Sequence, residues 1–300
     1  MELKEMLRKL DERFAGGEIT EETYKEIKRR YDEEAAGAQK SHFDSENKLP
    51  CGTPGGRERV PLVRVSGTND YDGNVCAVKV DVSGASDVNG DVDAESVVIS
   101  GSCDVSGSVK ASKAFFASGS SDIAGDIVSP DIRISGACEI GGNVSGDALD
   151  ISGACEINGD VTVGKCNLSG AVDVSGTLRA ITLKFTGASD LHDIEAETVE
   201  GRGAFEFGKM TAKTVKLGLV DTAKAVSVDA GDIEIKRHRD DGRLEIERIS
   251  AKGRLDIDGV TANEVTGDEV AIGPNCRIGS VKGRKIAVDK KATVDKVTEL

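Results

Sequence analysis

A glycine that returns at an almost constant interval is the feature that most limits how this chain can fold. Ser or Thr precedes it in every repeat, and a second glycine follows six residues later in seven of the eight repeats. The first glycines of the repeats are Gly67, Gly84, Gly101, Gly119, Gly136, Gly153, Gly170 and Gly187. A fixed period of this length is typical of an architecture in which similar units stack on one another.

Apolar side chains keep the same distances from the glycine in each repeat. Around Gly153 they stand at Leu149, Ile151, Ile157 and Val161, always an even number of positions away. Even spacing places them on one face of extended strands. The sequence therefore predicts an all-β fold, a parallel β-helix with about 17 residues per coil. Its glycines would lie at corners, where φ is positive or backbones approach closely.

The pattern divides the chain into three parts. Residues 1–35 predict a helical hairpin, residues 36–60 a flexible linker, and residues 61–300 a β-helix rod of about 14 coils. Coils in 61–195 are regular, those in 196–300 are less so, and residues 236–243 form a polar insertion. The apolar spacing is smaller by one position in the second half and predicts slightly shorter coils there, at Ile249, Val265, Val281 and Val297.

Composition excludes several classes of protein. The formal net charge is −14, which argues against a nucleic-acid partner because phosphate binding rests on Lys and Arg. No stretch of about 18 apolar residues is present for a membrane span, no signal peptide is evident, and no membrane attachment is evident. The 7 cysteines form no Cys-x-x-Cys pair, so we expect a reduced, cytoplasmic chain.

The sequence offers no catalytic residue, cofactor site or metal site. The three histidines, His42, His192 and His238, lack the spacing of metal ligands, and His42 with Cys51 would supply only half a zinc site. No hydrolase, zinc-protease or phosphate-binding motif occurs. We therefore expect a protein without enzymatic activity. A hexapeptide-type acyltransferase, with His192 as its catalytic residue, is the enzyme alternative.

An acidic residue stands three positions after the first glycine of every repeat. We call these first glycines the ladder glycines. Odd spacing turns these side chains outward, and stacking would align them in one column: Asp70, Asp87, Asp104, Asp122, Glu139, Glu156, Asp173 and Asp190. The column is either a solvated face that keeps the rod soluble, or a surface that collects cations or docks a basic protein partner. Charge is also polarised, since residues 66–195 hold 20 acidic and 7 basic side chains and residues 196–300 hold 19 of each.

Three cysteines share one inward position, two residues after the ladder glycine. These are Cys103, Cys138 and Cys155. They are interpreted as small core fillers. The alternative is a redox-dependent disulfide between Cys138 and Cys155, which lie one coil apart.

Two segments resemble known families. The ladder Ile134-Ser-Gly-Ala-Cys-Glu-Ile-Gly-Gly-Asn-Val144, repeated at Ile151–Val161, resembles bactofilins over about 62–300, more loosely after residue 195. The resemblance implies a right-handed β-helix and a cytoskeletal scaffold that polymerises without nucleotide. The rod is longer than usual for that family and lacks an aromatic C-terminal tail. Residues Leu7–Tyr31 are similar to the SHOCT helical hairpin, which implies a role in oligomerisation.

From these features we expect a structural scaffold that associates with itself end to end. The open end of a solenoid presents unpaired strands and an apolar cross-section. The candidate interface is the last coil, with Val288, Val294, Val297 and Leu300. A filament and a closed dimer both remain open. The alternative is a spacer that does not polymerise and presents Asp104, Asp122, Glu139, Glu156 and Asp173 to a partner.

Overall fold

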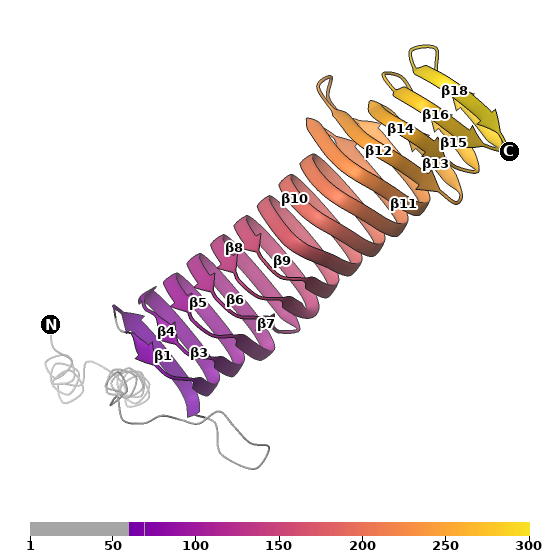
Figure 1. Cartoon of the computed structure of the whole chain (residues 1–300). Coiled ribbons are helices and arrows are strands. Elements are labelled where there is room, and N and C mark those ends of the chain that lie inside the picture. Colours follow the sequence, from indigo (N-terminus) through magenta and orange to yellow (C-terminus); the bar gives the residue numbers. More distant parts are fainter. Residues whose placement is uncertain (1–59, 69) are drawn as a thin grey trace, which may run out of the picture. The chain divides into compact units, whose positions relative to one another are not determined.

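The computed structural model describes residues 60–68 and 70–300, which belong to the second of two compact units, Leu49–Leu300 (Figure 1). The helical hairpin predicted for 1–35, with its SHOCT resemblance, lies outside the described residues. So do His42, Cys51 and the predicted linker up to residue 59. Residue 60 already begins the first strand, so the solenoid starts one residue earlier than predicted.

Strands account for nearly all of the described chain, and no helix occurs in it. The N-terminal strands are β1 (Val60–Gly67), β2 (Tyr71–Asp72), β3 (Val75–Ala85), β4 (Val88–Asn89), β5 (Val92–Val105), β6 (Val109–Ile123), β7 (Ile127–Val128), β8 (Asp131–Ile140) and β9 (Val144–Ile157). They are followed by β10 (Val161–Leu219), β11 (Thr222–Arg237), β12 (Arg243–Ala251), β13 (Arg254–Ile257), β14 (Val260–Thr266), β15 (Glu269–Ile272), β16 (Arg277–Gly283), β17 (Lys285–Val288) and β18 (Thr293–Glu299).

All of these strands pair in parallel, each with its equivalent one coil away (Figure 1). In β8 and β9 the register joins Ile134 to Ile151 and Ile140 to Ile157, which is the interval of the glycine repeat. The predicted parallel β-solenoid, with its coil length and its number of turns, is therefore confirmed. The right-handed sense of the coil stays a prediction.

The second half uses a different coil length, as its apolar spacing predicts. Val265 pairs with Val281, so the register shift is smaller by one than in β8 and β9. Between Ile233 and Leu255 the shift is larger, because this coil contains the polar insertion. The predicted insertion 236–243 is too wide: β11 continues to Arg237 and β12 begins at Arg243. Lys236 and Arg237 instead extend the ladder by pairing with β10.

One continuous apolar core runs through the stack. Side chains at even distances from the ladder glycine point inward, as predicted, and Phe115, Ile132 and Leu149 are fully buried in successive coils. Each rests on its equivalent in the next coil through the register of β6, β8 and β9. Branched aliphatic residues and alanine make up most of this narrow interior, which close packing must fill without voids. Its aromatic residues are Phe115, Phe185, Phe205 and Phe207.

The ladder glycines bend the strands at one corner of every coil. Their φ angles lie between +92° and +143°, a region that side chains with a Cβ avoid. At Gly136 an added Cβ would lie 2.2 Å from the carbonyl oxygen of Gly119, one coil away. The predicted corner role is thus confirmed, and both the backbone angle and the close contact demand glycine. The series continues one coil beyond the predicted end, to Gly203.

Replacing Gly136 with Ala should destabilise the solenoid by at least about 2 kcal/mol, because backbone strain adds to a clash with a neighbouring coil. Gly73 is the matched control: its φ is +116°, but an added Cβ meets nothing within 4 Å. Gly73→Ala should therefore cost only the backbone strain, about 1 kcal/mol. Denaturant unfolding of both variants measures the difference, and equal losses would mean that the contact with Gly119 does not matter.

Candidate interaction surfaces

The predicted acidic column exists as one row of carboxylates on the surface. Strand register places Asp104 beside Asp122, Asp122 beside Glu139, and Glu139 beside Glu156. Parallel neighbours lie about 4.8 Å apart. Every member is exposed except the half-buried Asp87. We use the name acidic column for Asp70, Asp87, Asp104, Asp122, Glu139, Glu156, Asp173, Asp190 and Glu206, the last being one coil more than predicted.

Like charges in this column help to raise the pKa of two of its members. The pKa of Asp104 is raised by partial desolvation and then by Asp122 and Asp87. That of Asp173 is raised by partial desolvation and then by Asp190. Within the described residues, the column carboxylates from Asp104 to Glu206 have no ion-pair partner. The charges therefore repel one another without compensation.

Elsewhere on the surface, carboxylates are paired across coils. Lys213 Nζ forms an ion pair with Glu197 Oε1 at 2.5 Å, and Lys184 Nζ forms one with Glu200 Oε2 at 2.7 Å. Further ion pairs join neighbouring coils of the second half. These include Lys236–Asp256, Lys282–Glu264, Arg284–Asp268 and Lys285–Glu269. The uneven charge along the sequence thus reflects two kinds of surface. In the second half, Lys and Arg pair with many of the acidic side chains, whereas the first half carries most of the acidic column, whose carboxylates have no such partners among the described residues.

Replacing Asp104 and Asp173 together with Asn should raise the melting temperature at pH 7 by about 1–3 °C at low salt. Because the pKa values of Asp104 and Asp173 are raised in the folded state, protonation of these carboxyls favours folding. The repulsion between carboxylates is therefore absent below pH 3.8, the usual pKa, and develops as the pH rises through the raised pKa values. The gain should therefore vanish near pH 3.5 and shrink above about 0.5 M salt.

The matched control is Asp147→Asn, which removes an exposed carboxylate that lies outside the column. It should leave the melting temperature unchanged. A lower melting temperature in the double variant would show instead that the two carboxylates hold a cation or a specific hydrogen bond.

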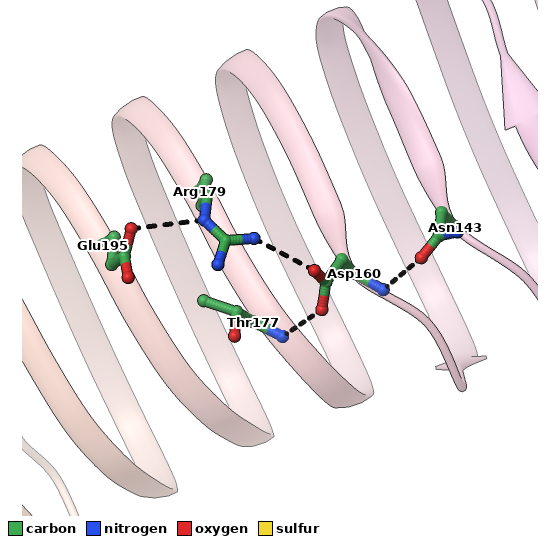
Figure 2. Close-up of polar contacts among 5 residues, drawn as sticks. All are labelled: Asn143, Asp160, Thr177, Arg179 and Glu195. Atoms are coloured by element: carbon green, nitrogen blue, oxygen red, sulfur yellow. Dashed lines mark hydrogen bonds and ion pairs between the residues drawn. The ribbon is translucent and has the colours of Figure 1, made fainter.

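A second row of polar side chains ties the coils together at the second-glycine corner (Figure 2). After six of the seven second glycines, the next residue accepts a hydrogen bond from the backbone N–H of its equivalent in the next coil. Asn143 Oδ1 accepts from Asp160 N at 2.8 Å, and Asp160 Oδ1 accepts from Thr177 N at 2.8 Å. We call this row the polar ladder; its acceptors are Asn74, Asp91, Ser108, Asp126, Asn143 and Asp160.

The polar ladder escaped the sequence analysis, although it left a signal. The residue after the second glycine is Asn, Asp, Ser or Thr in every repeat that has one. Such short polar side chains supply acceptors to backbone N–H groups at turns. The ladder therefore satisfies backbone donors at a corner where the strands themselves are interrupted.

Arg179 closes the polar ladder at its C-terminal end (Figure 2). Its guanidinium donates to Asp160 Oδ2 at 3.0 Å and to Glu195 Oε2 at 3.2 Å, so it bridges three coils. Hydrogen bonds from the backbone N–H of Thr177 and then from Arg179 lower the pKa of Asp160. The ionised form of Asp160 is the one that the folded state favours.

Replacing Asp160 with Ala should lower the melting temperature, because the N–H of Thr177 loses its acceptor. Asp160→Asn keeps an acceptor oxygen and loses only the charge, so its melting temperature should lie between those of Ala and parent. Because the pKa of Asp160 is lowered in the folded state, its ionised carboxylate stabilises the fold. This stabilisation is fully present above pH 3.8, the usual pKa, and is lost as the pH falls through the lowered pKa. Thermal melts should thus show parent and Asp160→Asn converging below about pH 3.5, and a constant gap would contradict this assignment.

The core cysteines behave as buried thiols. Cys138 and Cys155 are register neighbours in β8 and β9, and both are free. A hydrogen bond with Cys138, followed by burial, raises the pKa of Cys155. Burial raises the pKa of Cys103 to about 11. These observations support the interpretation as small core fillers, and the alternative disulfide is not formed. The expected reduced state is wrong at Cys76, which is disulfide-bonded.

The last coil exposes apolar residues whose equivalents are buried in earlier coils. Val297 is 51% exposed, whereas Val281 and Val265, which precede it in the same column, are fully buried. Val288 is 43% exposed, and Ile272, its equivalent one coil earlier, is buried. The other two predicted interface residues differ in burial: Leu300 is 73% exposed, while Val294 is partly buried against the core. The predicted interface residues therefore lie together at one end of the stack.

The two histidines of the described residues do not gather into a site. His192 is an exposed residue of β10, and His238 packs its ring next to Gly218. Within residues 60–68 and 70–300, no three His, Cys, Asp or Glu side chains lie close enough to hold a metal ion. The same residues contain no helix of the length and apolarity needed to cross a membrane. The absence of catalytic, cofactor and metal sites stays a prediction.

Residues 61–145 match the family model described as "Bactofilin: Polymer-forming cytoskeletal". The matched region runs from the second residue of β1 through β8 and ends at Ser145, the second residue of β9. The coils that follow continue the same register through β9 and β10, so the similarity to bactofilins ends within an unbroken stack. No curated protein and no solved structure matches the chain.

Proposed function

We propose that this chain is a structural scaffold that associates with copies of itself end to end, without nucleotide and without catalysis. The match to a polymer-forming cytoskeletal family over residues 61–145 supports the scaffold role. The continuous solenoid supports it too, because a stack of coils transmits load along its axis through an unbroken hydrogen-bond ladder.

One observation carries the proposal: Val288 and Val297 are exposed at positions that other coils bury. Another coil stacked on this end would cover them as Val281 covers Val265. The unpaired N–H and C=O groups of β17 and β18 would find partners at the same time. A second copy of the chain offers such a coil. Two C-terminal ends meeting would give a dimer, whereas both ends joining would give a filament.

Val297→Glu should abolish or strongly weaken the association, because an interface would have to bury an unpaired carboxylate. Val128→Glu is the matched control: Val128 is a 44% exposed valine of β7, in the N-terminal part of the stack and away from the C-terminal coil. Light scattering and negative-stain electron microscopy of parent and both variants measure assembly. If Val297→Glu assembles like the parent, the C-terminal coil is not the interface and the proposal is wrong.

The second candidate is a spacer that does not polymerise and presents the acidic column to a partner. The observation in its favour is that these carboxylates remain uncompensated while many other surface acids of the second half are paired. A parent protein that remains monomeric at high concentration would favour this candidate over the scaffold.

A further inference from the structure

A shallow groove runs along the solenoid beside the acidic column. Its volume is about 800 Å³, and it extends from Asp122 to Lys224. These two residues lie six coils apart, which corresponds to about 29 Å along the stack. This surface lies away from the C-terminal coil and is independent of end-to-end association.

Small side chains create the groove. Its floor is a row of alanines, one from each coil, immediately after the ladder glycines; all are exposed except the half-buried last one: Ala137, Ala154, Ala171, Ala188 and Ala204. The glycine corner leaves no room for larger atoms next to this row, since an added Cβ at Gly153 would lie 2.1 Å from the backbone oxygen of Gly136. A strip of Gly and Ala lets another backbone approach closely.

The wall of the groove consists of six carboxylates of the acidic column: Asp122, Glu139, Glu156, Asp173, Asp190 and Glu206. Among the described residues, none of the six has a cationic partner, although cross-coil ion pairs compensate acids elsewhere on the same solenoid. The row costs stability, because Asp190 contributes to the raised pKa of Asp173. Lys224, in register with Glu206, ends both the row and the groove.

We propose that this groove docks a basic amphipathic helix of another protein. Lys or Arg side chains on one face of a helix recur with each turn, every 5.4 Å, close to the coil spacing of about 4.8 Å. Twenty residues of helix span about 30 Å, the length of the groove. The alanine floor accepts the apolar stripe of the helix, and each turn brings one cation to one carboxylate.

The charge of the N-terminal residues argues that the helix in the groove comes from another protein and not from a second copy of this chain. Residues 1–35, for which the sequence predicts helices, hold 8 basic and 11 acidic side chains. Their net negative charge opposes docking on a row of carboxylates. An extended peptide fits the row less well, because its alternate side chains recur about every 6.6–6.8 Å.

The test uses a fluorescein-labelled synthetic helix of about 20 residues, with lysines on one face at i, i+4, i+7 and i+11 and alanine and leucine beside them. A permuted peptide of the same composition carries its lysines around the whole helix. Fluorescence anisotropy at about 0.15 M salt compares the two on the full-length protein. The one-faced peptide should bind at least about tenfold more tightly than the permuted one.

Two variants with matched controls locate the site. Replacing Glu139, Glu156 and Asp173 with Gln, Gln and Asn should weaken binding at least about tenfold. Replacing Asp70, Asp87 and Asp104 with Asn removes three charges of the same column outside the groove and should change affinity less than about threefold. Ala171→Gln fills the floor without altering any charge and should also weaken binding at least about fivefold. Thermal melts of each variant verify folding.

Equal losses from the two triple variants would overturn the proposal, since they would indicate only general attraction to an acidic surface. Unchanged binding by Ala171→Gln, or equal affinity for the two peptides, would overturn it as well. The C-terminal coil is intact in all three variants, so light scattering should show parent-like assembly whatever the peptide result. Failure of this proposal and failure of the end-to-end scaffold are therefore distinguishable.

Discussion

The hydrogen-bond ladder between parallel coils is the constraint on which the rest of the structure depends. It holds each residue about 4.8 Å from its equivalent in the next coil, so every choice of side chain is repeated along a column. At the ladder corner the carbonyl oxygen of Gly119 would lie 2.2 Å from a Cβ at Gly136. The backbone conformation there leaves no alternative to glycine. The same register that imposes glycine also stacks Ile134 on Ile151 and thereby builds the core.

Stacking like on like has opposite consequences in the two polar rows. In the polar ladder, each side chain is an acceptor for a backbone N–H of the next coil, so repetition satisfies a donor at every step. In the acidic column, each step sets one carboxylate beside another, and the raised pKa of Asp104 records part of the repulsion. Repetition therefore stabilises the polar ladder and destabilises the acidic column. Much of the second half of the solenoid avoids this charge repulsion, because Lys or Arg side chains lie opposite its acidic residues.

The regular half of this fold is readable from sequence because a constant period lets each position be compared with seven others. Inward positions, outward acids and the glycine corner all follow from that comparison, and the structure confirms them. The longer coil between Ile233 and Leu255 is different: it has no repeat to compare with, so the predicted insertion is too wide. Ion pairs such as Lys236–Asp256 depend on that irregular register and left no pattern in the sequence. The groove likewise depends on how low the alanine row lies beside the carboxylates, which spacing alone does not reveal.

The two candidate surfaces use the same stack in different ways. The end of the solenoid is apolar because a column of buried residues, Val265 and Val281, terminates in Val297 without a neighbouring coil in the described chain. In the proposed scaffold another coil would cover this end, so its partner would share the register and spacing of the solenoid. The side of the solenoid is acidic and has a narrow floor, and the partner proposed for it would need only a matching repeat of charge. A solenoid can therefore carry both interactions at once, because axial stacking fixes the coil spacing that the lateral groove presents to its partner.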